Sequence, residues 1–223
     1  MKIINCFICL LPWRIKRFLL IQLYGYKIDK SARIGFSYIF PKSLEMGPNT
    51  VIRNFCVCIN IDLLRIGNNS RIARGNWITG FPTGTNTEFF SHQKDRKAEF
   101  LIGNNTLVLK NHHFDCTNQI KIGDFTTIAG YNSQFLTHSI NVHKNIQDSN
   151  PISIGDYCFI GTRNIFLGGS VVPSKSVTGA GAVVTKDLSS FGEYSLFGGV
   201  PANFIKSLSS GDLYFQRTEG DVR

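Results

Sequence analysis

The sequence predicts an all-β chain that folds as a parallel β-helix, with a short N-terminal helical segment and a small C-terminal extension. Three observations predict it: a six-residue repeat, an apolar residue leading most repeats, and a small residue near the end of most of them. This period matches neither the about 3.6 residues of a helical turn nor the alternation of a simple strand. It fits a prism in which one hexad forms each flat side and three hexads form a coil.

The repeat is clearest from Ile154 onward. In steps of six the chain reads IGDYCF, IGTRNI, FLGGSV, VPSKSV, TGAGAV and VTKDLS. The leading residues, which we expect inside the prism, are Ile154, Ile160, Phe166, Val172, Thr178 and Val184. The small fifth residues are Cys158, Ser170, Ser176 and Ala182. A small residue near a corner relieves crowding where the chain turns. Earlier stretches keep the same period, from Met46, Ile66, Ile102 and Ile122.

Two polar segments interrupt the repeat, and they divide the predicted domain. The β-helix is expected over residues 31–190, with loops at 80–100 and 138–151. Insertions in a solenoid become loops on one side of the molecule, where functional sites gather. Residues 191–223 are expected to form a C-terminal extension, whose tail after Ser207 has no repeat and is predicted to be peripheral or disordered.

The first 30 residues predict an amphipathic helical segment. Neither of its two apolar runs reaches the roughly 20 residues that cross a bilayer. Its basic residues Arg14, Lys16 and Arg17 lie between the apolar runs, whereas a signal peptide places its charge first. Two interpretations remain open: the segment caps the end of the prism, which we favour, or residues 1–26 contact a membrane surface.

Composition limits the remaining possibilities. The chain has 223 residues, is 43% hydrophobic and can bury one core. Cys56 and Cys158 fall at small core positions, which favours reduced thiols, and the Cys6–Cys9 pair lacks the partners of a metal site. The formal charge is +9, but the basic residues do not form one block, so we expect no nucleic-acid binding. A basic surface also suits a polyphosphorylated cofactor or an anionic membrane.

Residues 122–206 resemble the galactoside, maltose and polysaccharide O-acetyltransferases of the hexapeptide-repeat family. The motifs that carry the resemblance are IGDFTTIAGYNSQFLTHS, NPISIGDYCFIGTRNIFLGGSVVP, GAGAVVTKD and FGGVPANFIK. Residues 30–121 resemble the family more loosely. The resemblance implies a left-handed winding, a homotrimer with its active site between subunits, acetyl-CoA as acyl donor, a saccharide acceptor and no metal.

The resemblance implies that His138, which opens the second loop, is the catalytic general base. Transfer of an acetyl group from a thioester to a hydroxyl needs a base for the hydroxyl proton, and histidine suits this role. His112 or His113 is the alternative base, and His143 is interpreted as a solvated side chain. Three residues one coil earlier are expected to contact the acceptor: Asn111, His113 and Asp115. Asn118 should lie on the same face.

The resemblance also implies a coenzyme A site along the C-terminal coils, in the groove between adjacent prisms. The residues that match the family's motifs are Thr162, Gly179, Ala180, Thr185, Lys186 and Lys206. Small residues let a cofactor approach the backbone, and the two lysines suit its phosphates. Two departures weaken the match: Asn203 to Lys206 lack the arginine that the family often has there, and Thr178 replaces the usual isoleucine of an IG pair.

These observations together predict an acetyl-CoA-dependent O-acetyltransferase that acts on a saccharide in surface polysaccharide biosynthesis, such as capsule or lipopolysaccharide. It would be cytoplasmic, at the inner face of the membrane. Serine and antibiotic acetyltransferases are alternatives, although residues 1–30 are too few for the helical domain of a serine acetyltransferase. A non-catalytic or zinc-binding β-helix is a third alternative, for which His112, His138 and His143 could supply ligands.

Overall fold

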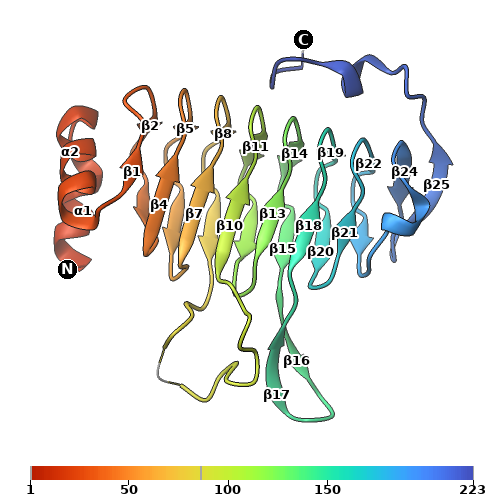
Figure 1. Ribbon diagram of the computed structural model, residues 1–223, viewed down its shortest axis with the longest axis horizontal. Coiled ribbons are helices and arrows are strands. Elements are labelled where there is room, and N and C mark those ends of the chain that lie inside the picture. Colours follow the sequence, from red (N-terminus) through yellow and green to blue (C-terminus); the bar gives the residue numbers. More distant parts are fainter. Residues whose placement is uncertain (1, 86, 223) are drawn as a thin grey trace.

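The computed structural model describes residues 2–85 and 87–222. Most of the chain forms a three-sided prism of parallel strands (Figure 1). The chain visits the three sheets in the order A, B, C and then returns to sheet A, so each coil contributes one strand to each sheet. The prism therefore has three rows of corners, named here the A–B, B–C and C–A corners.

Short strands form each side of the prism. Sheet A contains β1 (Lys27–Ile28), β4 (Ser43–Met46), β7 (Leu63–Ile66), β10 (Glu99–Ile102), β13 (Ile120–Ile122), β18 (Ile152–Ile154) and β21 (Val171–Val172). Sheet B contains β2 (Arg33–Ile34), β5 (Val51–Ile52), β8 (Arg71–Ile72), β11 (Leu107–Lys110), β14 (Thr127–Tyr131), β19 (Phe159–Ile160), β22 (Val177–Thr178), β24 (Ser195–Gly198) and β25 (Asn203–Ser207). Sheet C contains β3 (Tyr38–Phe40), β6 (Val57–Ile59), β9 (Trp77–Thr79), β12 (His113–Asp115), β15 (Gln134–Leu136), β20 (Ile165–Leu167) and β23 (Val183–Val184).

The leading residues of the hexads stack on like residues inside the prism. In sheet A, Ile102, Ile122 and Ile154 pair in register and are buried. In sheet C, the rings of Phe114 and Phe135 have centroids 4.7 Å apart, and Phe166 stacks on Phe135 at the same spacing. Strands in a sheet lie about 4.8 Å apart, so in-register coils bring identical side chains into contact.

The small residues near the corners also make hydrogen bonds between coils. The hydroxyls of Thr106 and Thr126 donate to the carbonyl oxygens of Gly123 and Gly155 at 2.7 and 2.8 Å. A Cβ added at Gly103 would meet backbone atoms of the next coil at 2.7 Å, so that corner requires glycine. The repeat therefore supplies hydrogen-bond donors to the backbone carbonyls at the corners as well as apolar side chains to the interior.

The N-terminal helical segment contains two helices that cover the end of the prism: α1 (Lys2–Leu10) and α2 (Trp13–Tyr24), separated by Leu11 and Pro12. Ile8 and Leu20 join the hydrophobic core. Lys16 is buried, and its Nζ donates to the carbonyl oxygens of Gly35 at 2.7 Å and Ser37 at 3.3 Å. Burial lowers the pKa of Lys16. Among the described residues, no helix is long and apolar enough to cross a bilayer.

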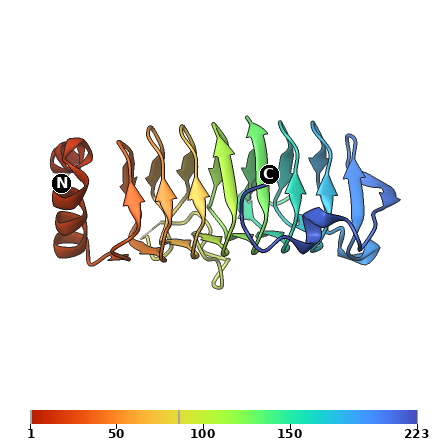
Figure 2. The same cartoon turned by 90° about the horizontal axis from the view of Figure 1, so that it is seen from above.

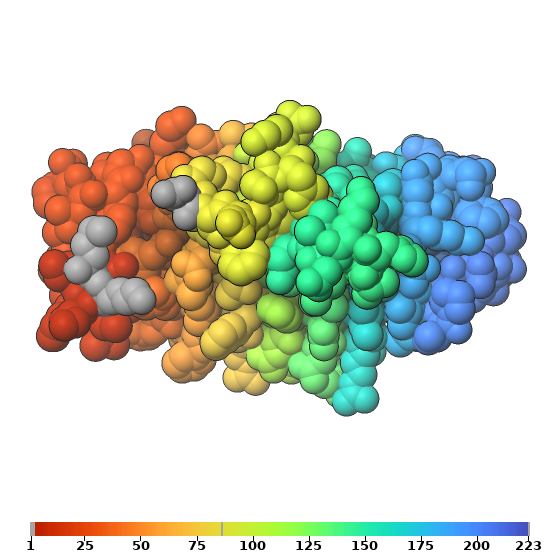
Figure 3. Space-filling view, turned by 90° about the horizontal axis from the view of Figure 1, so that it is seen from below, coloured from red at the N-terminus to blue at the C-terminus, as the bar shows by residue number. Residues whose placement is uncertain are grey.

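Both interruptions of the repeat leave the prism at the C–A corners. The first is the loop between β9 and β10, and the second contains an antiparallel hairpin of β16 (His138–Asn141) and β17 (Ile146–Ser149). They project from the same side of the prism (Figure 1). In the view from below, the loop and the hairpin lie side by side (Figure 3). The chain thus places its two irregular segments together, as expected for a functional side.

The C-terminal extension packs on the prism. β24 pairs in parallel with β22, so the repeat continues past the predicted boundary at residue 190, and β25 then pairs antiparallel with β24. Two short 3-10 helices flank these strands, η1 (Ser189–Phe191) and η2 (Leu213–Gln216). The tail then runs back over the prism toward its middle (Figure 2), where the hydroxyl of Tyr214 donates to the Cys158 carbonyl at 2.9 Å. The tail is therefore peripheral, as one of the two predicted possibilities had it, and it packs on the surface of the prism.

Candidate active site

A cleft of about 360 Å³ lies between the two projecting segments and the outer face of sheet C. Its lining comes from β9, β12 and β15 together with the loop and the hairpin: Thr79, Gly80, Phe81, Phe89, Phe90, His113, Asp115, Thr117, Leu136, His138 and Gln147. Three of the predicted site residues, His113, Asp115 and His138, therefore share one cleft. Aromatic rings from the loop form its apolar wall.

His138 is the first residue of β16, where the chain leaves sheet C. Its side chain is exposed, and the ring of Phe90 meets it edge-on with centroids 5.7 Å apart. The Oε1 atom of Gln147, on the facing strand of the hairpin, contacts the Nε2 atom of His138. The imidazole is thus held between an aromatic ring and an amide at the mouth of the cleft.

Asp115 is the last residue of β12, and its carboxylate contacts the start of the hairpin. Its Oδ1 accepts hydrogen bonds from the Thr117 amide at 3.0 Å and the Thr117 hydroxyl at 2.6 Å, and its Oδ2 accepts from the His138 amide at 3.3 Å. The neighbouring His113 has its Nε2 3.4 Å from the Thr79 hydroxyl. The Asp115 carboxylate therefore orients the backbone that carries His138 and keeps its remaining lone pairs beside the cleft.

Gln93 fastens the loop to the hairpin. Its Nε2 donates to Asp148 Oδ1 and to the Ser149 carbonyl, both at 2.7 Å, and its Oε1 accepts from the Ser149 hydroxyl at 2.6 Å. Asn118 adds a bond from its Nδ2 to Ser149 Oγ at 3.2 Å. Sequence reasoning missed Gln93, Phe90 and Gln147, because they lie in segments without a repeat.

Replacing Gln93 with alanine is expected to loosen the hairpin while the prism stays folded. Gln93 makes three hydrogen bonds that contribute about 1 kcal/mol net each, so we expect amides of residues 138–149 to exchange with deuterium on the order of 100-fold faster. Hydrogen–deuterium exchange read by mass spectrometry measures this, with Lys94→Ala as an exposed neighbouring control. Equal exchange in both variants would remove Gln93 from this role.

The alternative histidines have other environments. His112 points into the core, where its Nδ1 accepts from the Ser133 amide at 3.1 Å and burial lowers the pKa of His112 to about 4. His143 is exposed in the turn of the hairpin. The described residues hold no group of three His, Cys, Asp or Glu side chains that could bind a metal, so His112, His138 and His143 do not converge.

Asn111 does not reach the cleft. It occupies a B–C corner with a positive φ of 57°, a conformation that asparagine tolerates better than most residues. The cleft lies near the C–A corners, at the other end of the sheet C strands. The chain therefore separates Asn111 from His113 and Asp115, although they are close in sequence.

The predicted cofactor residues divide between two rows of corners. Thr185 and Lys186 follow β23 at a C–A corner, on the row that carries His138 two strands earlier in sheet C. Thr162 and the Gly179–Ala180 pair lie instead at B–C corners, where the Thr162 hydroxyl donates to the Tyr131 carbonyl at 3.0 Å. Lys206 is exposed on β25. One chain alone does not gather these residues into one groove.

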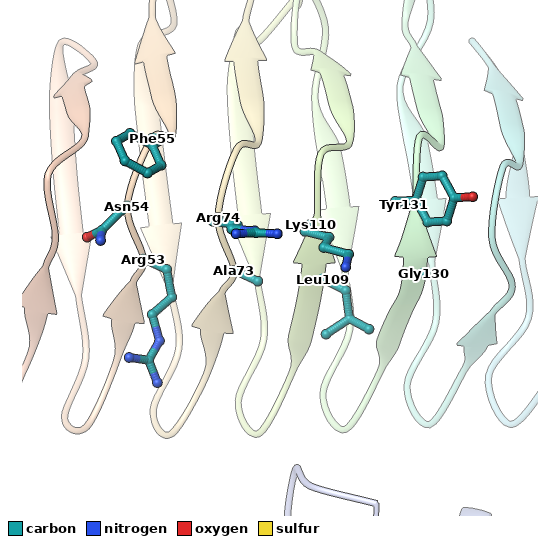
Figure 4. A pocket seen from close by; sticks show the side chains of 9 residues that line it. All are labelled: Arg53, Asn54, Phe55, Ala73, Arg74, Leu109, Lys110, Gly130 and Tyr131. Carbon is teal, nitrogen blue, oxygen red and sulfur yellow. The ribbon is translucent and has the colours of Figure 1, made fainter.

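A second groove, of about 780 Å³, follows the B–C corners (Figure 4). Its lining residues are Arg53, Asn54, Phe55, Ala73, Arg74, Leu109, Lys110, Gly130 and Tyr131. Among the described residues that line this groove, three side chains are cationic and none is acidic, and Phe55 and Leu109 add apolar surface. The groove has the character of a site for an anion with an apolar part.

Comparison with solved structures identifies the architecture. The chain resembles a hexapeptide-repeat-containing acetyltransferase of Vibrio cholerae O1 biovar eltor, solved with acetyl coenzyme A, at 23% identity and a TM-score of 0.50 over 65% of this chain and 71% of that one. The fold is that of the hexapeptide-repeat acetyltransferases. The predicted left-handed β-helix is confirmed.

A second solved structure matches the fold of nearly the whole chain. An N-acyltransferase of Bacillus cereus, solved as a variant with coenzyme A and dTDP-4-amino-4,6-dideoxyglucose, has a TM-score of 0.54 at 12% identity. The alignment covers 91% of this chain and 92% of that one. No protein-family model and no curated protein matches the chain by sequence.

Proposed function

We propose that this chain is an acetyl-CoA-dependent O-acetyltransferase that acetylates a saccharide hydroxyl, with His138 as general base. The observation that carries the proposal is the cleft that unites His138, His113 and Asp115 between the loop and the hairpin. A cleft with an imidazole at its mouth, a carboxylate beside it and aromatic walls suits the binding of a sugar and removal of its hydroxyl proton.

The residues of the cleft divide the work of the reaction. When bound, acetyl-CoA supplies the thioester carbonyl that the acceptor oxygen attacks. His138 takes the proton of the acceptor hydroxyl during the attack and returns it to the departing thiol sulfur. Gln147 and Phe90 hold the imidazole in place, and Asp115 orients the backbone of His138. His113 and Asp115 remain available to hydrogen-bond the acceptor.

The C-terminal coils fit a coenzyme A molecule. At the corner after β22, a Cβ added at Gly181 meets no atom of the described residues within 4 Å, and one added at Gly179 meets the Phe197 carbonyl oxygen at 3.5 Å. The backbone there is open to a ligand. Lys186 and Lys206 are exposed and suit its phosphates.

We propose further that three chains assemble with the active site between subunits. The predicted cofactor residues occupy two corner rows on either side of sheet C, and one flat groove cannot use both rows of one prism. Adjacent prisms that set the C–A corner of one chain against the B–C corner of its neighbour would bring both sets to one cofactor. The division of the residues supports this arrangement.

We place the reaction in the synthesis of a surface polysaccharide, on the cytoplasmic side of the membrane. The six cysteines are free thiols, as in a reducing compartment, and acetyl-CoA is the proposed donor. The acceptor itself is tested directly, by screening acetylation of candidate saccharides against serine as a competing acceptor. Acetylation of serine alone would replace the saccharide proposal.

Acetyl-CoA is expected to raise the melting temperature of the chain. A ligand at a concentration 100 times its Kd stabilises the folded state by about 2.7 kcal/mol, which for a chain of this length corresponds to roughly 5–10 °C. Differential scanning fluorimetry measures the rise, and Lys186→Ala should reduce it whereas Lys94→Ala should not. No rise at millimolar acetyl-CoA would contradict the proposed function.

A further inference from the structure

The two N-terminal helices carry large apolar side chains that remain exposed, together called the end plate here. Its residues and their exposed fractions are Ile3 (75%), Ile4 (54%), Phe7 (67%), Leu10 (69%), Ile15 (52%), Phe18 (60%) and Leu23 (60%). The sides of the helices that face the prism are already buried, because Ile8 and Leu20 pack into the core. The end plate is thus exposed apolar area beyond what capping requires, a mark of an interaction site.

The helices that carry the end plate lie at one end of the molecule (Figures 1 and 2). Both helices lie across the prism at the end opposite β24 and β25 (Figures 1 and 2). A flat partner could therefore cover the end plate without meeting the loop, the hairpin or the C-terminal tail.

Positive charge is concentrated at the same end. Residues 1–60 contain nine of the 24 Lys and Arg residues but two of the 15 Asp and Glu residues, so they carry seven of the nine net charges. The exposed cations near the end plate are Arg14, Lys27, Lys30, Arg33 and Lys42. One of the two acids, Glu45, is paired with Lys27 and Arg65. The partner that fits this end is both apolar and anionic.

We propose that the end plate docks on the surface of an anionic phospholipid bilayer. Helices with an apolar face and flanking basic residues lie in the interface, with their apolar side chains among the acyl chains. Each Lys or Arg near an anionic surface adds to the attraction. A second copy of this chain is disfavoured as the partner, because plate-to-plate contact would bring together two ends of +7 each.

Docking sets the height of the cleft, a consequence that rests on the proposed function. In sheet C, β15 lies four strands beyond β3, which is roughly 19 Å at about 4.8 Å per strand. The helical layer adds about 10 Å. His138 would stand about 30 Å above the bilayer. An acceptor anchored in that bilayer must then be an oligosaccharide rather than a single lipid-linked sugar.

Vesicle co-sedimentation tests the docking. The full chain is mixed with vesicles of phosphatidylcholine alone or of phosphatidylcholine with phosphatidylglycerol. We expect binding to the anionic vesicles that weakens with added salt. Phe7→Ser combined with Leu10→Ser should weaken binding at least tenfold, because each substitution removes apolar area that the bilayer would bury. The matched control is Val200→Ser with Leu213→Ser, two residues of equal or greater exposure outside the end plate.

Three outcomes would overturn the proposal. The first is absence of binding to anionic vesicles, and the second is equal loss of binding in the control. The third is that the unchanged protein binds no vesicles, while Phe7→Ser with Leu10→Ser lowers the mass of the particle in solution relative to the unchanged protein, as measured by light scattering. That result would make the end plate a protein–protein interface. Acetyl-CoA and acceptor are absent throughout, so failure here leaves the proposed acetyl transfer untouched.

Discussion

Replacing His138 with alanine is expected to lower turnover by on the order of 10²-fold or more, while acetyl-CoA still binds. The imidazole lies at the mouth of the cleft, where Gln147 and Phe90 hold it in position. Its removal leaves the prism intact because the side chain is exposed. Steady-state rates with a saccharide acceptor measure the effect, and the melting shift with acetyl-CoA checks binding.

The matched control for His138 is His143→Ala, which removes an exposed imidazole from the turn of the same hairpin. We expect its turnover to stay within about twofold of the unchanged protein, since surface substitutions away from special features have small effects. If His138→Ala retains full turnover, another group must take the proton. His113, in the same cleft, would then be the next candidate.

Replacing Phe135 with alanine is expected to lower the free energy of unfolding by about 3–5 kcal/mol. Phe135 is fully buried between the rings of Phe114 and Phe166, with centroids 4.7 Å away on each side. The substitution opens a cavity and also removes two stacked aromatic pairs. Chemical denaturation followed by circular dichroism measures the change in midpoint.

An exposed phenylalanine provides the control for the stacked one. Phe7→Ala should change the free energy of unfolding by less than about 0.5 kcal/mol, because Phe7 is 67% exposed. Equal effects of the two substitutions would mean that the Phe114–Phe135–Phe166 stack does not dominate core stability. Because Leu136 and Thr137 connect Phe135 to His138, we also expect the Phe135 variant to lose turnover.

The repeat was readable from sequence because each hexad occupies one side of one coil. Ile154, Ile160 and Phe166 are six residues apart and fall in sheets A, B and C in turn, each facing inward. The breaks in period predicted where the loop and the hairpin leave the prism. The two histidines of the NHHFD stretch follow the same logic, since alternation about the buried Phe114 turns His112 inward and His113 outward.

The details of the cleft depended on contacts that no period constrains. Gln93 meets Ser149 from 56 residues away, and both lie in irregular segments. Asn111 and His113 are two residues apart, yet the corner between sheets B and C separates Asn111 from the cleft. Sequence spacing predicted that Asp115 lies close to His138, and the Asp115 carboxylate does accept a hydrogen bond from the His138 amide. The same spacing could not place Asn111 beyond the corner.

Sequence alone determined the prism, because its information is local and repeats every six residues. The tertiary structure decided which side chains the ends of the prism bury. Lys16 lies in the interior, where the open end of the first coil offers the carbonyls of Gly35 and Ser37, while Phe7 faces outward. Hydropathy by itself would bury Phe7 and expose Lys16. Burial instead follows from the neighbours that packing supplies and from the backbone carbonyls that need hydrogen-bond donors at the open end of the prism.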